Sequence, residues 1–165
     1  MDLEKLIKNR RSTRKFKDTP VEDEKIEQIV EAARWAPSGL NNQPWRFYLA
    51  DEGERDKISG FTKYSNIIKN SKACICVFLD GEAVYDHTKD VQAVGACIQN
   101  MLLEAESMGI GTCWLGQILN QKEKVNSALG IGERYELMAV IALGYPDEKP
   151  VSGRKDVGEL MIEKE

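Results

Sequence analysis

The stretch that decides the fold spans residues 90–116 and reads "DVQAVGACIQNMLLEAESMGIGTCWLG". Its apolar side chains recur every three or four positions as far as Met108, which is the spacing of one face of a helix. Gly109 and Gly111 follow, and glycines are typical of a helix end. The last residues of the stretch, 112–116, form a short apolar segment. We therefore predict the longest helix of the chain at about residues 90–108, followed by a short extended segment.

Three further apolar runs outside this stretch predict β-strands, at residues 45–50, 73–79 and 135–143. The third run, "YELMAVIAL", is apolar along most of its length, which is typical of a strand covered on both faces. Other helices are expected at residues 2–9, at 54–63, at 121–129 and before the break at Pro37. Helices and strands do not alternate regularly, so we expect an α+β fold in one domain, residues 1–165.

The start of the second helix has its own signal. Thr19 and Glu22 stand at the spacing of a capping box, and Pro20 suits the first turn of a helix. The helix itself is indicated by apolar residues at Ile26, Ile29 and later positions of the same face.

The composition narrows the classes of function. The chain has 23 Lys and Arg against 27 Asp and Glu, a net charge of −4, so a broad basic face for nucleic acid is not expected. No apolar run approaches the ~20 residues that span a membrane, and the charged first ten residues do not resemble a signal peptide. We expect a cytoplasmic protein without nucleic-acid or membrane partners. Its four cysteines are expected to be reduced and buried, with no metal site.

Two common kinds of catalytic site are not expected. His87 is the sole histidine and lies in a polar segment, so a Ser–His–Asp triad does not stand out. Gly109, Gly111 and Gly116 follow a helix and not a strand, so they do not form a dinucleotide-binding fingerprint.

The first unusual segment is "RRSTRKF", residues 10–16, which places four positive charges and two hydroxyls in seven residues of an acidic chain. Arginine guanidinium groups and a serine hydroxyl can bind a phosphate through charge-assisted hydrogen bonds. Taken alone, the spacing of the segment favours a solvated arginine-rich turn over a phosphate site.

The second unusual segment is "APSGLNNQPW", residues 36–45, which has one hydroxyl and three amides between two prolines. Side-chain amides both donate and accept hydrogen bonds, as the edge of a heterocyclic ring requires. A polar connecting loop would have the same composition.

Taken together and in this order, the two segments resemble the N-terminal half of the FMN-dependent nitroreductase family. The C-terminal half is similar as well, through residues 90–116, then "LGIGERYELMAVIALGYPDEKP" and a basic tail. The chain is thus identified as a short member of that family. The resemblance implies a central, mainly antiparallel sheet flanked by helices, in a homodimer formed through the long helix.

The resemblance also implies a set of FMN-binding residues. Arg10, Arg11 and Ser12 match the family's phosphate and ribityl contacts, and Arg14 matches a basic residue near the pyrimidine side of the flavin. The partner subunit would deliver a loop that matches Pro37, Ser38, Gly39, Asn41 and Gln43, where Gly39 replaces a second serine. The backbone at Leu115 and Gly116 matches the stretch beside the hydride-accepting nitrogen, and Arg154 or Lys155 matches the basic tail residue.

The implied activity is that of an NAD(P)H-dependent flavin oxidoreductase. NADH or NADPH would reduce FMN, and a small acceptor such as a nitroaromatic or quinone would then take the electrons. No catalytic side chain is expected, because the cofactor supplies the chemistry. The alternatives are a flavin-binding sensor or carrier without turnover, and a dimeric protein that has lost the cofactor.

Overall fold

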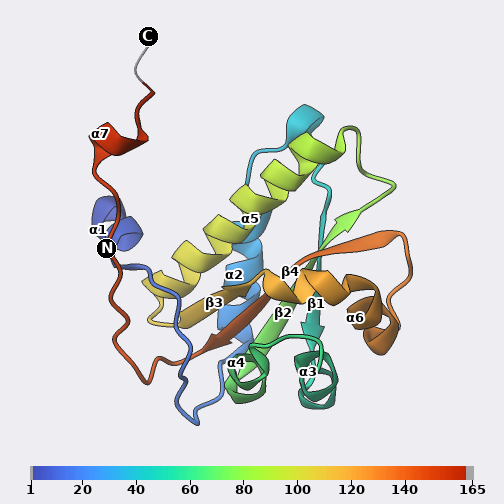
Figure 1. Ribbon diagram of the computed structural model, residues 1–165, viewed down its shortest axis with the longest axis horizontal. Coiled ribbons are helices and arrows are strands. Elements are labelled where there is room, and N and C mark those ends of the chain that lie inside the picture. The colour runs from blue at the N-terminus through green and yellow to red at the C-terminus, as the bar shows by residue number, and fades with distance from the viewer. Residues whose placement is uncertain (1, 163–165) are drawn as a thin grey trace.

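One four-stranded sheet lies at the centre of the molecule (Figure 1). The computed structural model describes residues 2–162. The strand order is β1-β2-β4-β3, and each neighbouring pair is antiparallel. The strands are β1 (Trp45–Ala50), β2 (Ala73–Asp80), β3 (Gly111–Leu115) and β4 (Tyr135–Gly144). The predicted α+β fold with a mainly antiparallel central sheet is therefore confirmed.

Helices cover both faces of the sheet (Figure 1). One face packs against α2 (Asp23–Arg34) and the long helix α5 (His87–Ser107). The other face packs against α3 (Glu52–Ser59), α4 (Ser65–Asn70) and α6 (Lys122–Leu129). The chain also forms α1 (Leu3–Asn9), the 3₁₀ turns η1 (Gly39–Asn41) and η2 (Gln117–Gln121), and α7 (Val157–Leu160) in the tail.

The two inner strands belong to both layers of the core. Every residue of β2 is buried, and its side chains alternate between the α2–α5 layer and the α3–α4–α6 layer. The register between β2 and β4 shifts at Val77 and Phe78, so Leu137 and Val140 both face the α3–α4–α6 layer. The prediction that the strand at residues 135–143, now β4, is covered on both faces is confirmed. The register shift between β2 and β4 had no signal in the sequence.

Three local predictions were wrong. Helix α5 begins at His87 and not at Asp90, because the Asp86 side chain accepts a 3.0 Å hydrogen bond from the Lys89 N–H and caps the helix there. The helix predicted at 54–63 ends at Ser59, and α4 follows where no helix was expected. Glu22 itself is the N-cap of α2 and makes no side-chain cap, so the box with Thr19 does not form.

All four cysteines are buried and free, as predicted. Burial raises the pKa of the Cys74 thiol to about 11 and that of Cys97 to about 12, so both thiols stay protonated near neutral pH. Within residues 2–162, no helix is both long enough and apolar enough to cross a membrane.

Candidate cofactor-binding site

The basic segment lies in extended form against the edge of the sheet. Arg10 is the C-cap of α1, and the chain then runs beside β3, where the Thr13 N–H donates a 2.8 Å hydrogen bond to the Thr112 carbonyl. A Cβ on Gly111 would lie 2.6 Å from the Thr13 hydroxyl oxygen, so this approach depends on the absence of a side chain there. The start of β3 is thus adapted to hold the segment in place.

The Arg10 side chain lies near two other positively charged side chains, those of Arg11 and Arg154. The side chain is partly buried, and burial together with the charges of Arg154 and Arg11 lowers its pKa, while Glu106 partly offsets this effect. Among the described residues, none of the three arginines forms an ion pair with a carboxylate. The Arg11 guanidinium donates instead to the carbonyls of Lys8 and Arg10, at 2.5 and 2.9 Å. The cluster therefore fits an anionic group such as a phosphate.

The two tail residues differ in what the structure shows of them. Arg154 donates to the Ser152 hydroxyl and the Gly153 carbonyl, at 3.1 and 2.7 Å, and its charge reaches Arg10. Lys155 is exposed and has no hydrogen bond among the described residues. Arg154 therefore lies with the basic segment, as the sequence implied, and a role for Lys155 stays a prediction.

Arg14, in the same segment, lies near Cys113 of β3. The Arg14 side chain is exposed, and its guanidinium donates a 3.2 Å hydrogen bond to the Ser12 carbonyl. Burial raises the pKa of Cys113 in β3, and the charge of Arg14 counteracts part of this rise. The Leu115 side chain is buried in the core, so only its backbone can face a ligand. A Cβ on Gly116 would meet no protein atom within 4 Å, which leaves space for a ligand beside it.

The second predicted half of the site is the loop between α2 and β1, residues 37–43. Its η1 turn is closed by hydrogen bonds from the Asn41 and Asn42 N–H groups to the carbonyls of Ser38 and Gly39, both at 3.1 Å. The Ser38 hydroxyl also accepts a 3.0 Å hydrogen bond from the Gln43 N–H. Leu40, Asn41 and Gln43 all have positive φ, near 50°, which is costly for residues other than glycine. Several contacts hold the loop in this conformation.

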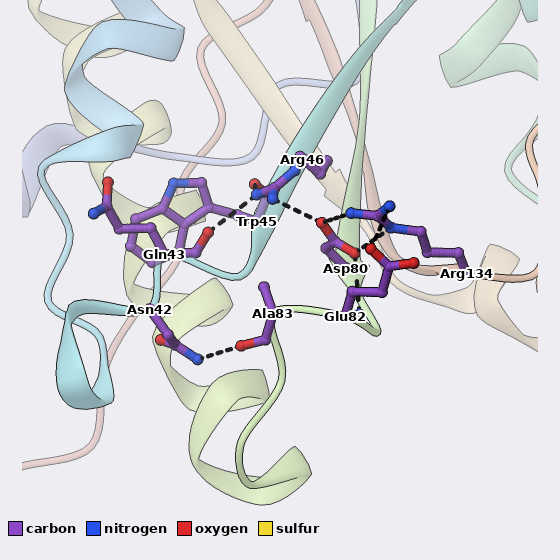
Figure 2. A network of polar contacts seen from close by, with 8 residues as sticks. All are labelled: Asn42, Gln43, Trp45, Arg46, Asp80, Glu82, Ala83 and Arg134. Atoms are coloured by element: carbon purple, nitrogen blue, oxygen red, sulfur yellow. Dashed lines mark hydrogen bonds and ion pairs between the residues drawn. The ribbon is translucent and has the colours of Figure 1, made fainter.

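One of these contacts is Asn42, which anchors the loop to the segment before α5 (Figure 2). Its side-chain amide donates to the Ala83 carbonyl at 2.9 Å and to the buried carboxylate of Asp90 at 2.8 Å. Burial alone would raise the pKa of Asp90, but hydrogen bonds from Asn42 and from the Asp86 and Tyr85 N–H groups lower it overall. Asp90 therefore stays ionised while fully buried.

A second anchor ends at Asp80, the last residue of β2 (Figure 2). Its buried carboxylate lies 2.7 Å from the Arg46 guanidinium and accepts hydrogen bonds of 2.6 and 2.8 Å from Arg134. Arg46 in turn donates to the Gln43 carbonyl at 3.1 Å. The C-terminal end of the loop is therefore connected to a charged group in the protein interior.

The two halves of the predicted site do not meet within one chain. The loop contacts Asp90 near the start of α5, whereas Arg10 lies near Glu106 at its end (Figure 1). These positions are 16 residues apart on the helix, or about 24 Å at 1.5 Å per residue. One chain therefore brings together Arg10, Arg11, Ser12, Arg14 and Arg154 along β3, the strand that ends at Leu115 and Gly116, and places Pro37, Ser38, Gly39, Asn41 and Gln43 elsewhere.

The sequence prediction missed the residues that support the loop. Asp80 and Asp90 are fully buried acids, and each had a signal, since Asp80 ends an apolar strand and Asp90 precedes the apolar face of the long helix. A buried carboxylate requires partners, so both positions could have been assigned a structural role. That Asn42 and Arg46 are the partners follows only from the tertiary structure.

Comparisons with known proteins identify the family of the chain. A family model described as "Nitroreductase family" matches residues 7–72 and 62–145. A provisionally named NADH dehydrogenase/NAD(P)H nitroreductase from Archaeoglobus fulgidus is 38% identical, over 88% of this chain and 86% of its own length. An NADPH-flavin oxidoreductase from Vibrio harveyi is 28% identical, over 85% of this chain and 64% of its own.

The same family is found among solved structures. A provisionally named nitroreductase from Desulfovibrio desulfuricans, solved in complex with FMN, is 42% identical and superposes with a TM-score of 0.96. The match covers 100% of this chain and 98% of that one. The predicted class of enzyme, an NAD(P)H-dependent flavin oxidoreductase, and the predicted cofactors agree with the names of these relatives. By the family model and by identity over nearly its whole length, this chain belongs to the nitroreductase family.

Proposed function

We propose that this protein is an FMN-dependent oxidoreductase that takes electrons from NADH or NADPH and reduces a small organic acceptor. The observation that carries the proposal is the cluster of Arg10, Arg11 and Arg154, whose mutual repulsion calls for an anion and which has no carboxylate ion pair among the described residues. A phosphate of FMN can supply that anion, and a 42% identical relative was solved in complex with FMN.

The resemblance to the family supports a role for each site residue. Arg10, Arg11, Ser12 and Arg154 hold the phosphate and ribityl chain, with Lys155 as a further cation. Arg14 lies by the pyrimidine side, where a positive charge stabilises the negative charge of the reduced ring. The backbone of Leu115 and Gly116 lies against the hydride-accepting edge, because the Leu115 side chain is buried and Gly116 leaves open space.

The complete site requires two copies of the single-domain chain. A homodimer with its α5 helices side by side and antiparallel places the loop of one copy near the basic segment of the other. Pro37, Ser38, Gly39, Asn41 and Gln43 then approach the flavin of the partner subunit. The 24 Å separation within one chain, estimated from the helix rise, supports this arrangement.

The reaction has two half-reactions at one face of the cofactor. Bound FMN accepts a hydride from NADH or NADPH and returns the electrons to a nitroaromatic, quinone or related acceptor. The chain itself binds the cofactor, orients it and supplies positive charge. The second substrate can bind only after the first product leaves, which gives ping-pong kinetics.

The test is the visible absorption spectrum of protein that has been supplemented with FMN and desalted, before and after anaerobic NADH or NADPH. We expect a retained flavin spectrum that bleaches with the nucleotide and returns on addition of a quinone or nitroaromatic. A flavin that is retained but stays oxidised would favour a sensor or carrier without turnover. Loss of all flavin on desalting would contradict the cofactor assignment.

A further inference from the structure

The space beside Gly39 is filled by Tyr85, which lies 46 positions further along the chain, in the segment before α5. A Cβ built on Gly39 would overlap the Tyr85 hydroxyl and would lie 2.5 Å from two carbons of its ring. Real Cβ atoms do not approach other atoms this closely, so a side chain at position 39 would require the phenol, the outer end of a half-exposed side chain, to move from its observed position. The phenol therefore stands where a side chain of the loop would otherwise be.

One buried carboxylate fixes both partners of this contact. Asp90 accepts a 2.8 Å hydrogen bond from the Asn42 side chain through one oxygen, and a 2.9 Å hydrogen bond from the Tyr85 N–H through the other. The ring of Tyr85 is further oriented by Lys89, whose ammonium lies 5.2 Å from the ring centroid. The backbone of Tyr85 is thus held by the same carboxylate that anchors the loop through Asn42.

The Tyr85 hydroxyl has no hydrogen-bond partner within residues 2–162, and the side chain is 43% exposed. It lies beside Gly39, in the loop that also carries Ser38, Asn41 and Gln43, whose hydroxyl and amide groups suit the edge of a heterocycle. We propose that Tyr85 is a flavin-binding residue, and that its hydroxyl supplies to the partner subunit's cofactor the polar contact that Gly39 cannot make. This inference rests on the proposed function.

The inference predicts that Gly39 and Tyr85 act as a pair. In Tyr85→Phe, only the hydroxyl is lost, so FMN should bind about two- to tenfold more weakly with an unchanged Tm. In Gly39→Ser, the new side chain displaces the phenol from its observed position beside the loop, so FMN binding should weaken about tenfold, while the Tm should change little because the exposed ring can turn away. Gly39→Ser combined with Tyr85→Ala removes the collision and restores a hydroxyl, so most of the lost affinity should return.

Two control variants separate the hydroxyl from the ring. Gly39→Ser combined with Tyr85→Phe keeps the two ring carbons at 2.5 Å and should stay as impaired as Gly39→Ser alone. Tyr135→Phe removes a phenol hydroxyl that also lacks a partner among the described residues, on the other side of the sheet, and should leave FMN affinity unchanged.

The experiment is a fluorescence titration of FMN into each apo-protein, together with a thermal melt of each variant. Weaker binding by Tyr85→Phe at unchanged Tm, with recovery in the Gly39→Ser and Tyr85→Ala combination, supports the inference. Wild-type affinity in Tyr85→Phe, or a Gly39→Ser variant that binds as the wild type does, overturns it. Wild-type protein that binds no FMN would instead overturn the proposed function, and this inference with it.

Discussion

Arg10 illustrates how the charges around a side chain can mark it as a candidate binding residue. Its guanidinium is partly buried, and burial and the neighbouring charges of Arg154 and Arg11 lower its pKa. The apo-protein therefore bears a repulsion that a bound phosphate relieves. Residues that oppose one another in this way contribute to binding and not to the stability of the free protein.

We expect Arg10→Ala to weaken FMN binding by about 1.5–3 kcal/mol per lost hydrogen bond to a charged group, or at least about tenfold. The Tm of the apo-protein should change little, because the substitution also removes the repulsion. FMN titration and thermal melts measure both effects. The control is Lys17→Ala, an exposed cation of the same region whose side chain has no described contact. Equal FMN affinity in the two variants would contradict the phosphate assignment.

Asp80 differs from Arg10, because its charge is paired with the opposite charges of Arg46 and Arg134. Hydrogen bonds from Arg134 lower the pKa of this buried carboxyl to about 2. A lowered pKa stabilises the folded state at every pH above the unfolded value of about 3.9, and this stabilisation is lost as the pH falls toward 2. Asp80 should therefore contribute to acid unfolding in that range.

For Asp80→Asn we expect the free energy of unfolding at neutral pH to fall by about 2 kcal/mol, because charged hydrogen bonds are lost. The decline in stability between about pH 4 and pH 2 should also become shallower. Urea unfolding at a series of pH values tests both points. The matched control is Asp18→Asn, whose carboxylate lies 2.6 Å from Lys72 but is 99% exposed, so solvent screens the pair. A pH profile of Asp80→Asn identical to that of the wild type would refute the assignment.

At the scale of elements, those with strong periodicity could be predicted from the sequence. The strands at 45–50, 73–79 and 135–143 and the long helix were found because their apolar patterns reflect burial in one core. The division between α3 and α4 was missed, because the polar residues around Thr62 indicate a turn without showing that a second helix follows. Capping was assigned to Thr19 although Glu22 is the N-cap, since several polar residues there compete for one position.

For the candidate site too, some features could be predicted from the sequence and others could not. The basic segment and the loop were visible as unusual local compositions. Their separation along α5, and the contacts of the loop with Asp80, Asp90 and Tyr85, depend on residues more than 30 positions apart in the sequence. Such contacts leave no local pattern, so a single sequence does not reveal them.

The backbone conformation of the loop, residues 37–43, leads to a prediction about strain at Leu40. Leu40 has a φ of 55° and is 86% exposed, so its backbone carries the cost of a left-handed conformation without burying its side chain. Leu40→Gly should raise the free energy of unfolding by up to about 1 kcal/mol, because the relief of strain exceeds the added entropy of the unfolded chain.

Urea unfolding of Leu40→Gly and Leu40→Ala measures this effect, since alanine removes the same side chain and retains the strain. The glycine variant should be the more stable of the two. If the alanine variant had an equal or higher free energy of unfolding, the left-handed conformation at residue 40 would not be a source of strain. The contacts of Asn42 and Arg46 would then not be required to hold the loop in that conformation.

At the scale of the whole molecule, the length of α5 decides how a site can form. The helix separates the loop from the basic segment by about 24 Å, so one copy presents two incomplete halves. A two-fold axis across antiparallel α5 helices would bring unlike halves together twice, giving two equivalent sites. A site shared between two subunits can therefore be distinguished by experiment from a site within one chain.

The prediction concerns two variants that are each defective in a different half. Arg10→Ala removes the phosphate contact. The combination Asn41→Gly and Gln43→Gly removes two loop amides at positions whose positive φ suits glycine. Each variant alone should bind FMN weakly. After the two are mixed in equal amounts and allowed to exchange subunits, half of the dimers contain one chain of each kind.

In such a mixed dimer, the intact basic segment of one chain faces the intact loop of the other, and the second site carries both defects. About a quarter of all sites should then bind FMN with wild-type affinity, because half of the dimers have one intact site of two. A fluorescence titration resolves this tight fraction, and unmixed samples at equal concentration are the control. If both halves belonged to the same chain, mixing could restore no site, and the titration would show only the weak binding of the separate variants.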